Sequence, residues 1–478
     1  MNVVNKKTKI VATIGPATQS EAMLSELLKA GFNIMRLNFS HGDFAEHQVK
    51  VDNLKKASKK TGIPAATMQD LGGPKIRIGD FENGAVTLKE GQKFTLTTDK
   101  IVGNEDRVSV NYEPLPKELK VGGFILLHDG KKRLEITDIK GNDVICKVIV
   151  GGEIKNKRGV NLPGAHLSIS SLTPKDKKDL EFGIKNKVDF VAFSFVRRAD
   201  DIRELRAMLA KAKSEAKIIA KVEDTEGLEN IDEIIELVDG VMVARGDMAI
   251  EIGAENVPMV QKSIIQKCNE QGKLVITATH MLESMIKSPV PTRAEVSDIA
   301  NAIIDGTDAI MLSEETTLGD FPVEAVAVMT RVAQKVENDA IYIDHVIEDQ
   351  MYKHPSTDNR VADAITNEVV DLANTLDAKA IVAFTESGFT ARMIARYKPL
   401  QPVLAMTPNE KTHNQLLMSF GVTPVLIKKT LMLNDVIKQA KAHCLKYKLA
   451  DKGDKIVLAL GMPFGKKVDT NMILVETI

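Results

Sequence analysis

The chain has 478 residues, with 64 lysines and arginines against 65 aspartates and glutamates, so its formal net charge at pH 7 is −1. This length allows two to four domains with large cores. The balanced charge argues against a dedicated nucleic-acid or membrane-surface binder, because such proteins carry an excess of positive charge.

The three cysteines, Cys146, Cys268 and Cys444, lie far apart, and no C-x-x-C spacing exists to hold zinc. A sparse, odd set of cysteines is typical of a reducing compartment. The segment MNVVNKKTKIVATIG lacks the apolar core of a signal peptide, and no apolar run approaches membrane-spanning length. We therefore expect a cytoplasmic protein with no nucleic-acid or membrane partner.

Eight apolar, β-branched runs are typical of buried parallel strands, and helical patterns separate them. The strand runs span residues 7–15, 32–40, 64–70, 188–196, 217–224, 240–247, 273–280 and 308–315. The helical patterns include 19–30, 43–60, 174–186, 199–213, 227–238, 257–270, 292–304 and 321–338. Eight strand–helix units of this kind predict a (β/α)8 barrel.

The pattern changes between Asp70 and about Ser168, where short strands alternate with turns. The segments GAVTLKEGQKFTLTT, LLHDGKKRLEI and DIKGNDVICKVIV each predict a hairpin. We therefore expect a small β-barrel domain over 71–167, inserted into a discontinuous barrel domain of residues 1–70 and 168–342. Gly72-Gly73-Pro74 and Leu162-Pro163-Gly164 mark its junctions, so this domain is expected to swing as a lid.

Residues 343–478 form the third predicted domain, which follows a polar stretch at roughly 340–360. The runs KAIVAFTES, PVLAMT, TPVLIK, KIVLALG and NMILVE alternate with helical patterns and predict an open α/β sheet. Thr385, Ser387, Gly388 and Thr390 lie where a strand ends and a helix begins, a place that suits a phosphate group. Plain helix capping is the alternative interpretation.

Polar residues end all eight predicted barrel strands. The active site of such a barrel lies at the C-terminal ends of its strands, and the inserted domain leaves from the same rim because it follows the third strand. The rim residues are Thr13, Arg36, Asn38, Ser40, Asp70, Ser194, Lys221, Glu223, Arg245, Asp247, Thr277, Thr279, Ser313 and Glu315.

Glu223 and Asp247 end neighbouring strands, so their carboxylates can meet. Two such carboxylates repel each other unless one is protonated or a cation lies between them, and oxygen-only ligands suit magnesium or manganese. Lys221 lies two residues before Glu223 and points to the same side of the strand, toward any anionic group that undergoes transfer. Ion pairing at a strand end is the alternative for each residue, but the combination favours a metal site.

Two further rim residues suit an anionic substrate. Arg36 could clamp a phosphate or carboxylate from the second strand. The backbone N–H of Gly246 opens a helix-like run and can hold an anion at low steric cost.

Together these motifs resemble those of the pyruvate kinase family, in the family's order and over essentially the whole chain. They are ATIGPAT (12–18), MRLNFSHG (35–42), QDLGGPKIRIG (69–79), RGVNLPG (158–164), AKVEDTEGLENIDEI (220–234), VMVARGD (241–247), TATHMLESM (277–285) and PTRAEVSDIANAIIDGTDAIMLSEET (291–316). The resemblance implies a glycolytic homotetramer that transfers a phosphoryl group from phosphoenolpyruvate to ADP, giving pyruvate and ATP.

Site roles carried over by this resemblance concern metal, substrate and nucleotide. The resemblance implies that Glu223 and Asp247 hold Mg²⁺ (or Mn²⁺) and that Lys221 stabilises the transferring phosphoryl group. Substrate would contact Arg36, Gly246, Asp247 and Thr279, and nucleotide would face Asn38, His41, Arg77 and Arg158. His280 and Glu314 depart from the glutamine and glycine common in the family, which puts the details of proton delivery in doubt.

Many members also bind a monovalent cation, through residues that match Asn38, Ser40, Asp70 and Leu71. Here Leu71 stands where potassium-dependent members usually carry threonine, and Lys75 stands where they carry glutamate. The Lys75 ammonium could supply the positive charge that potassium otherwise brings. We therefore expect a vestigial or weak potassium site and no potassium requirement, with a solvated Lys75 as the alternative.

The resemblance further implies a phosphorylated allosteric effector, a sugar phosphate or AMP, at Thr385, Ser387, Gly388 and Thr390. Lys466 and Lys467 of the loop GMPFGKKVDTN (461–471) would reach a second anion. Two other functions stay open, a metal-dependent aldolase of pyruvate enolates and a catalytically inactive metabolite sensor. The aldolase needs neither the lid nor Lys221, and the intact rim residues argue against the sensor.

Overall fold

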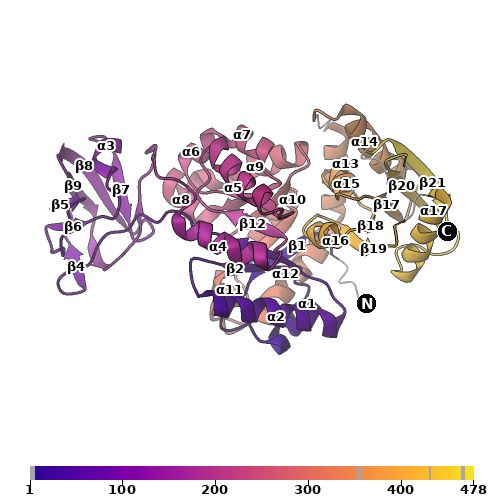
Figure 1. Ribbon diagram of the computed structural model, residues 1–478, viewed down its shortest axis with the longest axis horizontal. Coiled ribbons are helices and arrows are strands. Elements are labelled where there is room, and N and C mark those ends of the chain that lie inside the picture. The colour runs from indigo at the N-terminus through magenta and orange to yellow at the C-terminus, as the bar shows by residue number, and fades with distance from the viewer. Residues whose placement is uncertain (1–5, 353–356, 430–431, 464–468) are drawn as a thin grey trace.

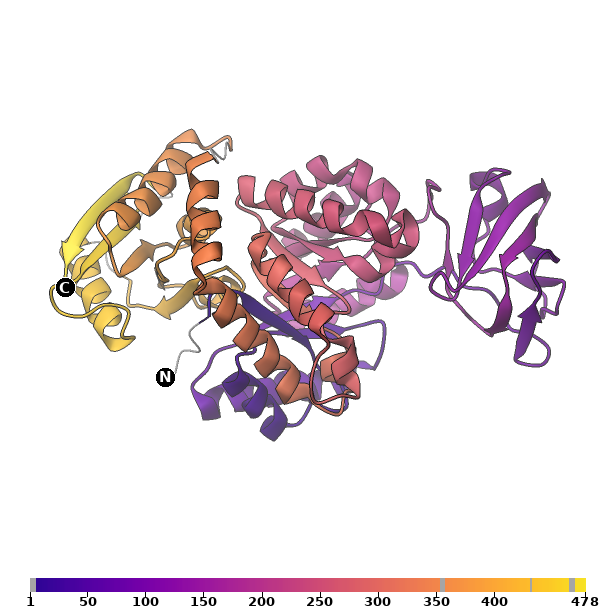
Figure 2. The same ribbon diagram turned by 180° about the vertical axis from the view of Figure 1, so that it is seen from behind.

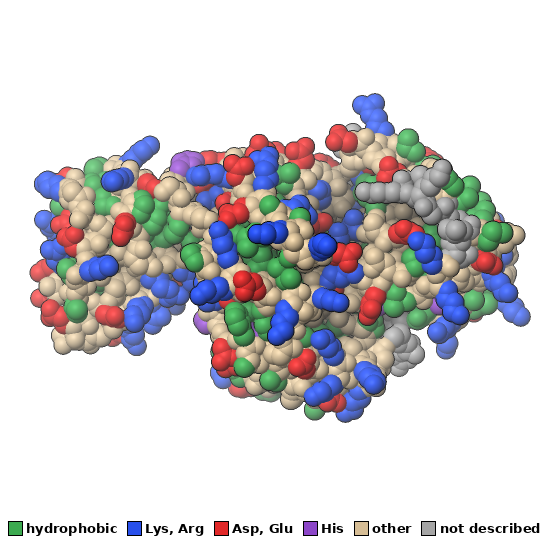
Figure 3. Space-filling model, viewed as in Figure 1, with side chains coloured by type: hydrophobic (Ala, Val, Ile, Leu, Met, Phe, Trp, Pro, Cys, Tyr) green, Lys and Arg blue, Asp and Glu red, His purple; other side chains and the backbone are tan. Residues whose placement is uncertain are grey.

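The computed structural model describes residues 6–352, 357–429, 432–463 and 469–478, with the side chains of 349–352 left out. A closed barrel lies in the middle, the inserted β domain lies at one end and the C-terminal α/β domain lies at the other (Figures 1 and 2). The predicted fold class is therefore confirmed. In the space-filling view the inserted domain is a lobe at one end of the molecule, next to the barrel (Figure 3). None of the described helices is long and apolar enough to cross a membrane.

The barrel is a closed parallel sheet of eight strands in the order β1-β16-β15-β14-β13-β12-β3-β2. All eight predicted runs contribute a strand. They are β1 (Lys9–Thr13), β2 (Ile34–Asn38), β3 (Ala66–Asp70), β12 (Phe190–Phe193), β13 (Lys217–Val222), β14 (Gly240–Ala244), β15 (Leu274–Ala278) and β16 (Ala309–Leu312). Their near-continuous burial reflects the helices outside and the packed side chains inside.

Helices surround the barrel, and the longer ones bury their apolar faces against the outward side chains of the strands. They are α1 (Glu21–Ala30), α2 (Phe44–Thr61), α4 (Pro174–Lys185), α5 (Ala199–Lys211), α6 (Thr225–Glu229), α7 (Ile231–Leu237), α8 (Arg245–Ile252), α9 (Val257–Glu270), α10 (Arg293–Ile304), α11 (Glu314–Thr317) and α12 (Pro322–Glu337), with short 3₁₀ turns η1 (Ala254–Asn256) and η2 (Glu283–Ile286). Thr173 and Thr292 form the capping boxes that start α4 and α10.

The predicted helix 227–238 is wrong as a single element, because the chain divides there into α6 and α7. Asn230 lies between the two helices with φ −99° and ψ 16°. Its side-chain amide donates a 2.9 Å hydrogen bond to the carbonyl oxygen of Arg197. Asparagine has a low helix propensity, and this bond to another segment favours the break.

The inserted domain contains a six-stranded sheet in the order β11-β7-β8-β9-β5-β6 and a two-stranded ribbon of β4 and β10. Its elements are β4 (Ala85–Leu88), β5 (Lys93–Thr97), β6 (Arg107–Ser109), α3 (Leu115–Glu118), β7 (Phe124–Leu127), β8 (Lys132–Lys140), β9 (Asp143–Val150), β10 (Gly152–Lys155) and β11 (Val160–Asn161). The hairpins β7–β8 and β8–β9 form as predicted.

The hairpin predicted within GAVTLKEGQKFTLTT is wrong. β4 pairs with β10, whereas β5 pairs with β9 and β6. The turn residues explain this choice, because the N–H of Gly91 donates to the carbonyl of Val148 at 2.8 Å and the N–H of Val148 donates to the carbonyl of Gln92 at 2.8 Å. The hydrogen bonds of the connection are thus made with β9 and not with β4.

The C-terminal domain contains a five-stranded sheet in the order β19-β18-β17-β20-β21, in which β21 is antiparallel. All five predicted strand runs form strands. Its elements are α14 (Arg360–Thr375), β17 (Ala380–Phe384), α15 (Phe389–Ala395), β18 (Val403–Thr407), α16 (Glu410–Leu416), β19 (Val422–Leu426), α17 (Leu433–Lys446), β20 (Lys455–Leu460) and β21 (Met472–Thr477).

The stretch at 340–360 was predicted only as a polar connection, but it contains the helix α13 (Ala340–Tyr352). Tyr342 and Val346 are buried in the cluster that also holds α1 and α12. These two side chains are four residues apart and so lie on one helical face, and their burial stabilises the helix.

The C-terminal domain covers the end of the barrel opposite the active-site rim. Leu417 and Met418 belong to the apolar cluster that fills the barrel interior. Lys398 pairs with Asp308 and Lys411 pairs with Asp189, both at 2.8 Å, beside the N-terminal ends of β16 and β12. The rim that carries the candidate site therefore faces the inserted domain.

Candidate active site

The alternation of side chains along β13 places Lys221 inside the barrel. Ile219 belongs to the interior cluster, whereas Ala220 and Val222 pack against the outer helices. Lys221 shares the inward side with Ile219 because strand side chains alternate with a period of two. Glu223, just beyond the strand, is also buried and contacts Lys221.

Lys221 is the centre of a buried hydrogen-bond network. Its Nζ lies 2.7 Å from Ser194 Oγ, 3.0 Å from Glu223 Oε1 and 3.4 Å from Asp70 Oδ1. Burial favours the neutral amine, but the charges of Asp70 and Glu223 outweigh it and raise the pKa of Lys221. The residue therefore presents a fixed positive charge at the bottom of the site.

Glu223 is less well compensated than Lys221. One carboxylate oxygen accepts a 2.8 Å hydrogen bond from the backbone N–H of Phe195. Burial, despite the opposing charge of Lys221, together with the nearby carboxylate of Asp247 raises the pKa of Glu223 to about 7. A buried carboxylate that is destabilised by a second carboxylate nearby favours a cation between the two.

This donor set fits magnesium or manganese, because both prefer oxygen ligands. Among the described residues no group of three or more His, Cys, Asp or Glu side chains is placed to hold a metal ion. A cation held by Glu223 and Asp247 would therefore take its other ligands from substrate and water, as Mg²⁺ commonly does.

Arg36 is buried and anchored on two sides. Its Nε lies 2.6 Å from Asp70 Oδ2, and its Nη1 lies 2.8 Å from Thr13 Oγ1. Burial alone would raise the pKa of Asp70, but the charges of Arg36 and Lys221 lower it below its usual value. Asp70 is thus a buried anion that fixes two cations of the site.

Arg245 and Asp247 lie in the first turn of α8 and not on the strand, because β14 ends at Ala244. The Thr279 Oγ1 accepts a 2.9 Å hydrogen bond from Gly246 N–H and donates a 2.6 Å bond to the carbonyl of Ala278. The Gly246 N–H predicted to hold an anion is therefore already bonded, and an incoming carboxylate must share or replace the threonine hydroxyl. Thr279 has φ 70°, a strained conformation for a β-branched residue.

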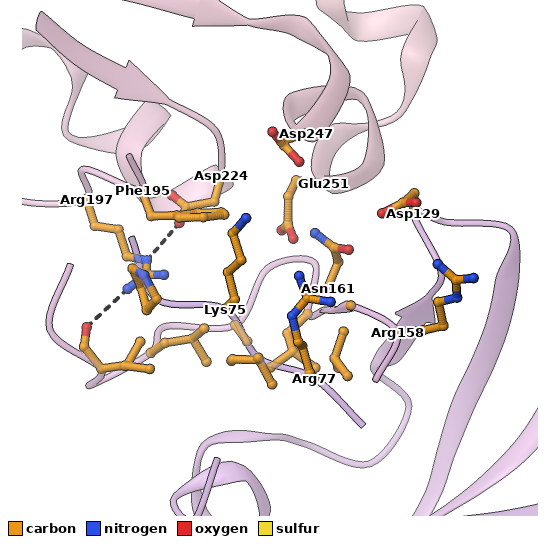
Figure 4. A pocket seen from close by; sticks show the side chains of 18 residues that line it. Lys75, Arg77, Asp129, Arg158, Asn161, Phe195, Arg197, Asp224, Asp247 and Glu251 are labelled. Atoms are coloured by element: carbon orange, nitrogen blue, oxygen red, sulfur yellow. Dashed lines mark hydrogen bonds and ion pairs between the residues drawn. The ribbon is translucent and has the colours of Figure 1, made fainter. Parts of the chain in front are cut away.

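A cavity of about 310 Å³ lies where the lid meets the barrel. In Figure 4 Asp247 and Glu251 line its barrel side, whereas Lys75, Arg77, Asn161 and Arg158 line its lid side. The side chain of Lys75 extends between Phe195 and Glu251 in the direction of Asp247. Both charge signs thus converge on a space that suits a phosphorylated ligand with its cation.

Of the predicted nucleotide residues, Arg77 and Arg158 line this cavity, whereas Asn38 and His41 lie outside its lining. Arg158 Nε is buried without a hydrogen-bond partner among the described residues. Arg77 Nη1 donates to the carbonyl of Lys157 at 2.7 Å. Burial, with the charges of Lys75, Arg77 and Arg36, lowers the pKa of His41.

Of the residues that match the potassium site, Asn38, Asp70 and Leu71 have oxygens that already have partners. Asn38 Oδ1 accepts a 3.0 Å bond from Ser40 N–H. The Leu71 carbonyl accepts a 2.7 Å bond from Ser194 Oγ, and the Leu71 side chain is buried in the barrel's outer core. Asp70 is paired with Arg36 and Lys221.

Family models match both major parts of this chain. The model for the pyruvate kinase barrel domain matches residues 5–326, and the model for the pyruvate kinase alpha/beta domain matches residues 363–476. The chain belongs to the pyruvate kinase family.

Full-length relatives of the pyruvate kinase family agree with this assignment. A pyruvate kinase of Clostridium perfringens is 44% identical over 478 residues, which is 99% of this chain and 100% of the relative. One of Geobacillus stearothermophilus is 44% identical over 478 residues, 99% of this chain and 81% of the relative. A crystal structure of a Cryptosporidium parvum pyruvate kinase has a TM-score of 0.94 and 36% identity, and the match covers 99% of this chain and 97% of that one.

The residues predicted for a pyruvate kinase effector lie at the end of β17. Thr385 Oγ1 accepts a 2.9 Å bond from Gly388 N–H, and the buried Thr390 hydroxyl is bonded to that of Thr470 at 2.7 Å. Ser387 is exposed. Its Oγ accepts only a long 3.4 Å bond from the N–H of Phe389, so Ser387 is the most accessible of the three hydroxyls. Lys466 and Lys467 lie outside the described residues.

The sequence placed Arg245 on the rim without a role, and it did not identify Asp298, Glu251 or Asn161, which also shape this pyruvate kinase site. The guanidinium of Arg245 pairs with both carboxylate oxygens of Asp298 and donates to the carbonyls of Ala278 and Thr279. Glu251 and Asn161 face each other across the cavity, and only the spacing of Glu251, four residues after Asp247, gave a signal in the sequence. His280 and Glu314, the two departures, are exposed.

Proposed function

We propose that this protein transfers the phosphoryl group of phosphoenolpyruvate to ADP, giving pyruvate and ATP, as the glycolytic step of its family. One observation carries the proposal. Lys221 is held by Ser194, Glu223 and Asp70 at the bottom of a rim site, where burial and the nearby carboxylate of Asp247 raise the pKa of Glu223 to about 7 despite the charge of Lys221. Family membership over the whole chain supports it.

In this proposal Glu223 and Asp247 hold the divalent cation, Mg²⁺ or Mn²⁺. The cation, when bound, supplies positive charge to the phosphoryl and carboxylate oxygens of the substrate. Lys221 needs no rearrangement to act, since three acceptors already fix its ammonium. Its charge stabilises the transferring phosphoryl group, in keeping with a reaction that depends on positioning and electrostatics.

Arg36 and Thr279 complete the substrate contacts. The guanidinium of Arg36 is fixed by Asp70 and Thr13 and offers its remaining N–H groups to phosphate. Gly246, Asp247 and the Thr279 hydroxyl lie where the substrate carboxylate would bind, with Thr279 near the carbon that is protonated after transfer. Strain at Thr279 is typical of a catalytic position.

Arg77 and Arg158 are proposed to bind the nucleotide phosphates from the lid. Both line the cavity above Asp247, and the unpaired Nε of Arg158 supports an anion partner there. Asn38 and His41 would contact the nucleotide from the barrel rim. Water exclusion by the lid would strengthen these contacts.

Lys75 is proposed to replace the monovalent cation, so that potassium is not required. Burial and the charges of Arg77 and Lys221 lower the pKa of Lys75, while Asp247 and Glu223 oppose this shift. The oxygens of Asn38 and Leu71 are already bonded, and Asp70 already has two cationic partners, so Asn38, Ser40, Asp70 and Leu71 would form at most a weak potassium site.

The remaining features rest mainly on the family. We propose allosteric activation by a phosphorylated effector at Thr385, Ser387, Gly388 and Thr390, a homotetramer, and a cytoplasmic location. Arg392, which donates to the carbonyl of Ser387, would favour an anionic effector, whereas the charge of nearby Lys429 is paired with Glu386.

The test is ADP-dependent formation of pyruvate from phosphoenolpyruvate, measured with purified protein and Mg²⁺. We expect pyruvate only when phosphoenolpyruvate, ADP and the metal are all present, and no pyruvate in excess chelator. A pyruvate-enolate aldolase would instead release pyruvate from a hydroxy-keto acid without ADP. A full-length protein that gave no pyruvate in this assay would contradict the proposal.

A further inference from the structure

The helix that carries Asp247 also contacts the lid one turn later. Glu251 lies four residues after Asp247 in α8, so the two carboxylates share one face of the helix. Burial and the charge of Asp224 raise the pKa of Glu251 to about 7, whereas the side chain of Asn161 and the backbone N–H of Leu162 lie close enough to the carboxyl group to oppose this shift. Figure 4 shows Glu251 directed from the barrel side toward Asn161 on the lid side.

A second contact lies beside the first. Gly130 is so close to α8 that a Cβ added to it would lie 3.6 Å from Ile250 Cγ2. Gly130 belongs to the connection between β7 and β8, in which His128, Asp129 and Gly130 all have positive φ values of 55°, 56° and 78°. This tight turn allows the lid backbone to approach the barrel helix.

Both contacts belong to one ribbon of the lid. Asn161 of β11 pairs with Leu126 of β7, and the N–H of His128 donates to the carbonyl of Gly159 at 3.1 Å. The same ribbon carries Arg158, and Arg77 forms a bridge with Gly159. A contact that holds Asn161 and Leu162 in place therefore also fixes the positions of Arg77 and Arg158 relative to Asp247.

We propose that Glu251 is a positioning residue that docks the lid on α8, so that Arg77 and Arg158 are held in register with the carboxylate of Asp247. The carboxylate acts through Asn161 and Leu162 and touches no reacting atom. This inference rests on the proposed function, since it assigns the lid arginines to the nucleotide. In this proposal α8 carries the metal ligand Asp247 and also fixes the position of the lid through Glu251.

The experiment compares Glu251→Ala and Asn161→Ala with the control Glu255→Ala, which changes an exposed glutamate four residues further on. We expect loss of the contact between Glu251 and Asn161 to increase the KM for ADP about tenfold in either test variant. We expect the KM for phosphoenolpyruvate to change less than about twofold. The double variant should be no worse than Glu251→Ala, because Asn161→Ala removes one of the contacts that Glu251→Ala already removes.

Lid position is measured independently of turnover. Double electron–electron resonance gives the distance between spin labels at Lys140→Cys in the lid and Lys178→Cys on the barrel. All three native cysteines are buried, so labelling is directed to the introduced sites. A broader distance distribution in Glu251→Ala, absent in Glu255→Ala, supports the inference even if the protein makes no pyruvate. An unchanged distribution, or equal losses for both substrates with no change in lid distance, overturns it.

Discussion

Lys221 Nζ lies 3.0 Å from Glu223 Oε1, and both side chains are almost fully buried. This contact joins the proposed phosphoryl-stabilising cation directly to a proposed metal ligand. A change at Lys221 therefore removes transition-state charge and also leaves Glu223 without its cationic partner.

We expect Lys221→Met to reduce kcat about 10²- to 10³-fold, because loss of one preorganised electrostatic contact costs about 3–4 kcal/mol. Glu223→Gln and Asp247→Asn should have effects of similar size. The control is Lys217→Met, which changes the other lysine of β13, paired with Asp239 at the far end of the barrel. Near-normal turnover in folded Lys221→Met would show that the role assigned to this residue is wrong.

The metal-free protein should lose stability as pH rises. Burial and Asp247 raise the pKa of Glu223 from 4.5 to about 7, so between these values the folded state keeps a proton that the unfolded state releases. A shift of this size corresponds to at most roughly 3 kcal/mol of unfolding free energy. This contribution is present below pH 4.5 and is lost as the pH rises through about 7.

Urea unfolding in chelator at pH 4.5 and 7.5 measures this effect. We expect Glu223→Gln, which has no charge to desolvate, to gain stability relative to wild type at the higher pH. Mg²⁺ should remove the difference, since the cation compensates the ionised carboxylate. Parallel pH curves for the two proteins in chelator would contradict this account.

The Arg245–Asp298 pair should control Thr279 without touching substrate. The two short bonds to Asp298, 2.6 and 2.8 Å, fix a guanidinium that also donates to the Thr279 carbonyl at 2.7 Å. Lysine cannot reproduce this planar set of donors, so the strained Thr279 would relax. We expect Arg245→Lys to lower kcat about tenfold with little change in melting temperature, whereas the exposed Arg293→Lys retains wild-type kcat.

Activity should be full in potassium-free buffer. Lys75 would repel a cation placed about 4 Å away by about 4 kcal/mol at an intermediate effective dielectric. We expect equal rates in potassium and tetramethylammonium salts, and a partial potassium requirement in Lys75→Glu. If potassium strongly activated the wild type relative to tetramethylammonium, the proposal that Lys75 replaces potassium would be refuted.

An effector should bind through the exposed Ser387, since Thr385 and Thr390 are engaged within the protein. We expect titration calorimetry to detect a sugar monophosphate or AMP, and Ser387→Ala to weaken binding by about tenfold. Ser214→Ala, in a loop of the barrel, serves as the control. Heats no larger than dilution for every phosphorylated metabolite tested would remove the proposed site.

The local sequence pattern was sufficient to predict the barrel, its insertion and the inward direction of Lys221. The period-two alternation of β13 placed Lys221 on the inward side, and the order of strand runs predicted the barrel with its insertion. These features depend on neighbours in the sequence, so short-range periodicity and capping residues are sufficient to reveal them. The grouping of Glu223 with Asp247 followed as well, because adjacent strands of a parallel barrel end on one rim.

Tertiary structure alone decided the partners of these residues. Arg36 meets Asp70, Gly246 meets Thr279, and Glu251 faces Asn161 of the lid. The sequence pattern likewise did not predict the pairing of β4 with β10 or the burial of α13. Each of these contacts and pairings joins segments that are far apart in the sequence. Side-chain periodicity does not determine them, because many strand and helix pairings satisfy the same local pattern. Only the packing of the whole chain selects one of them.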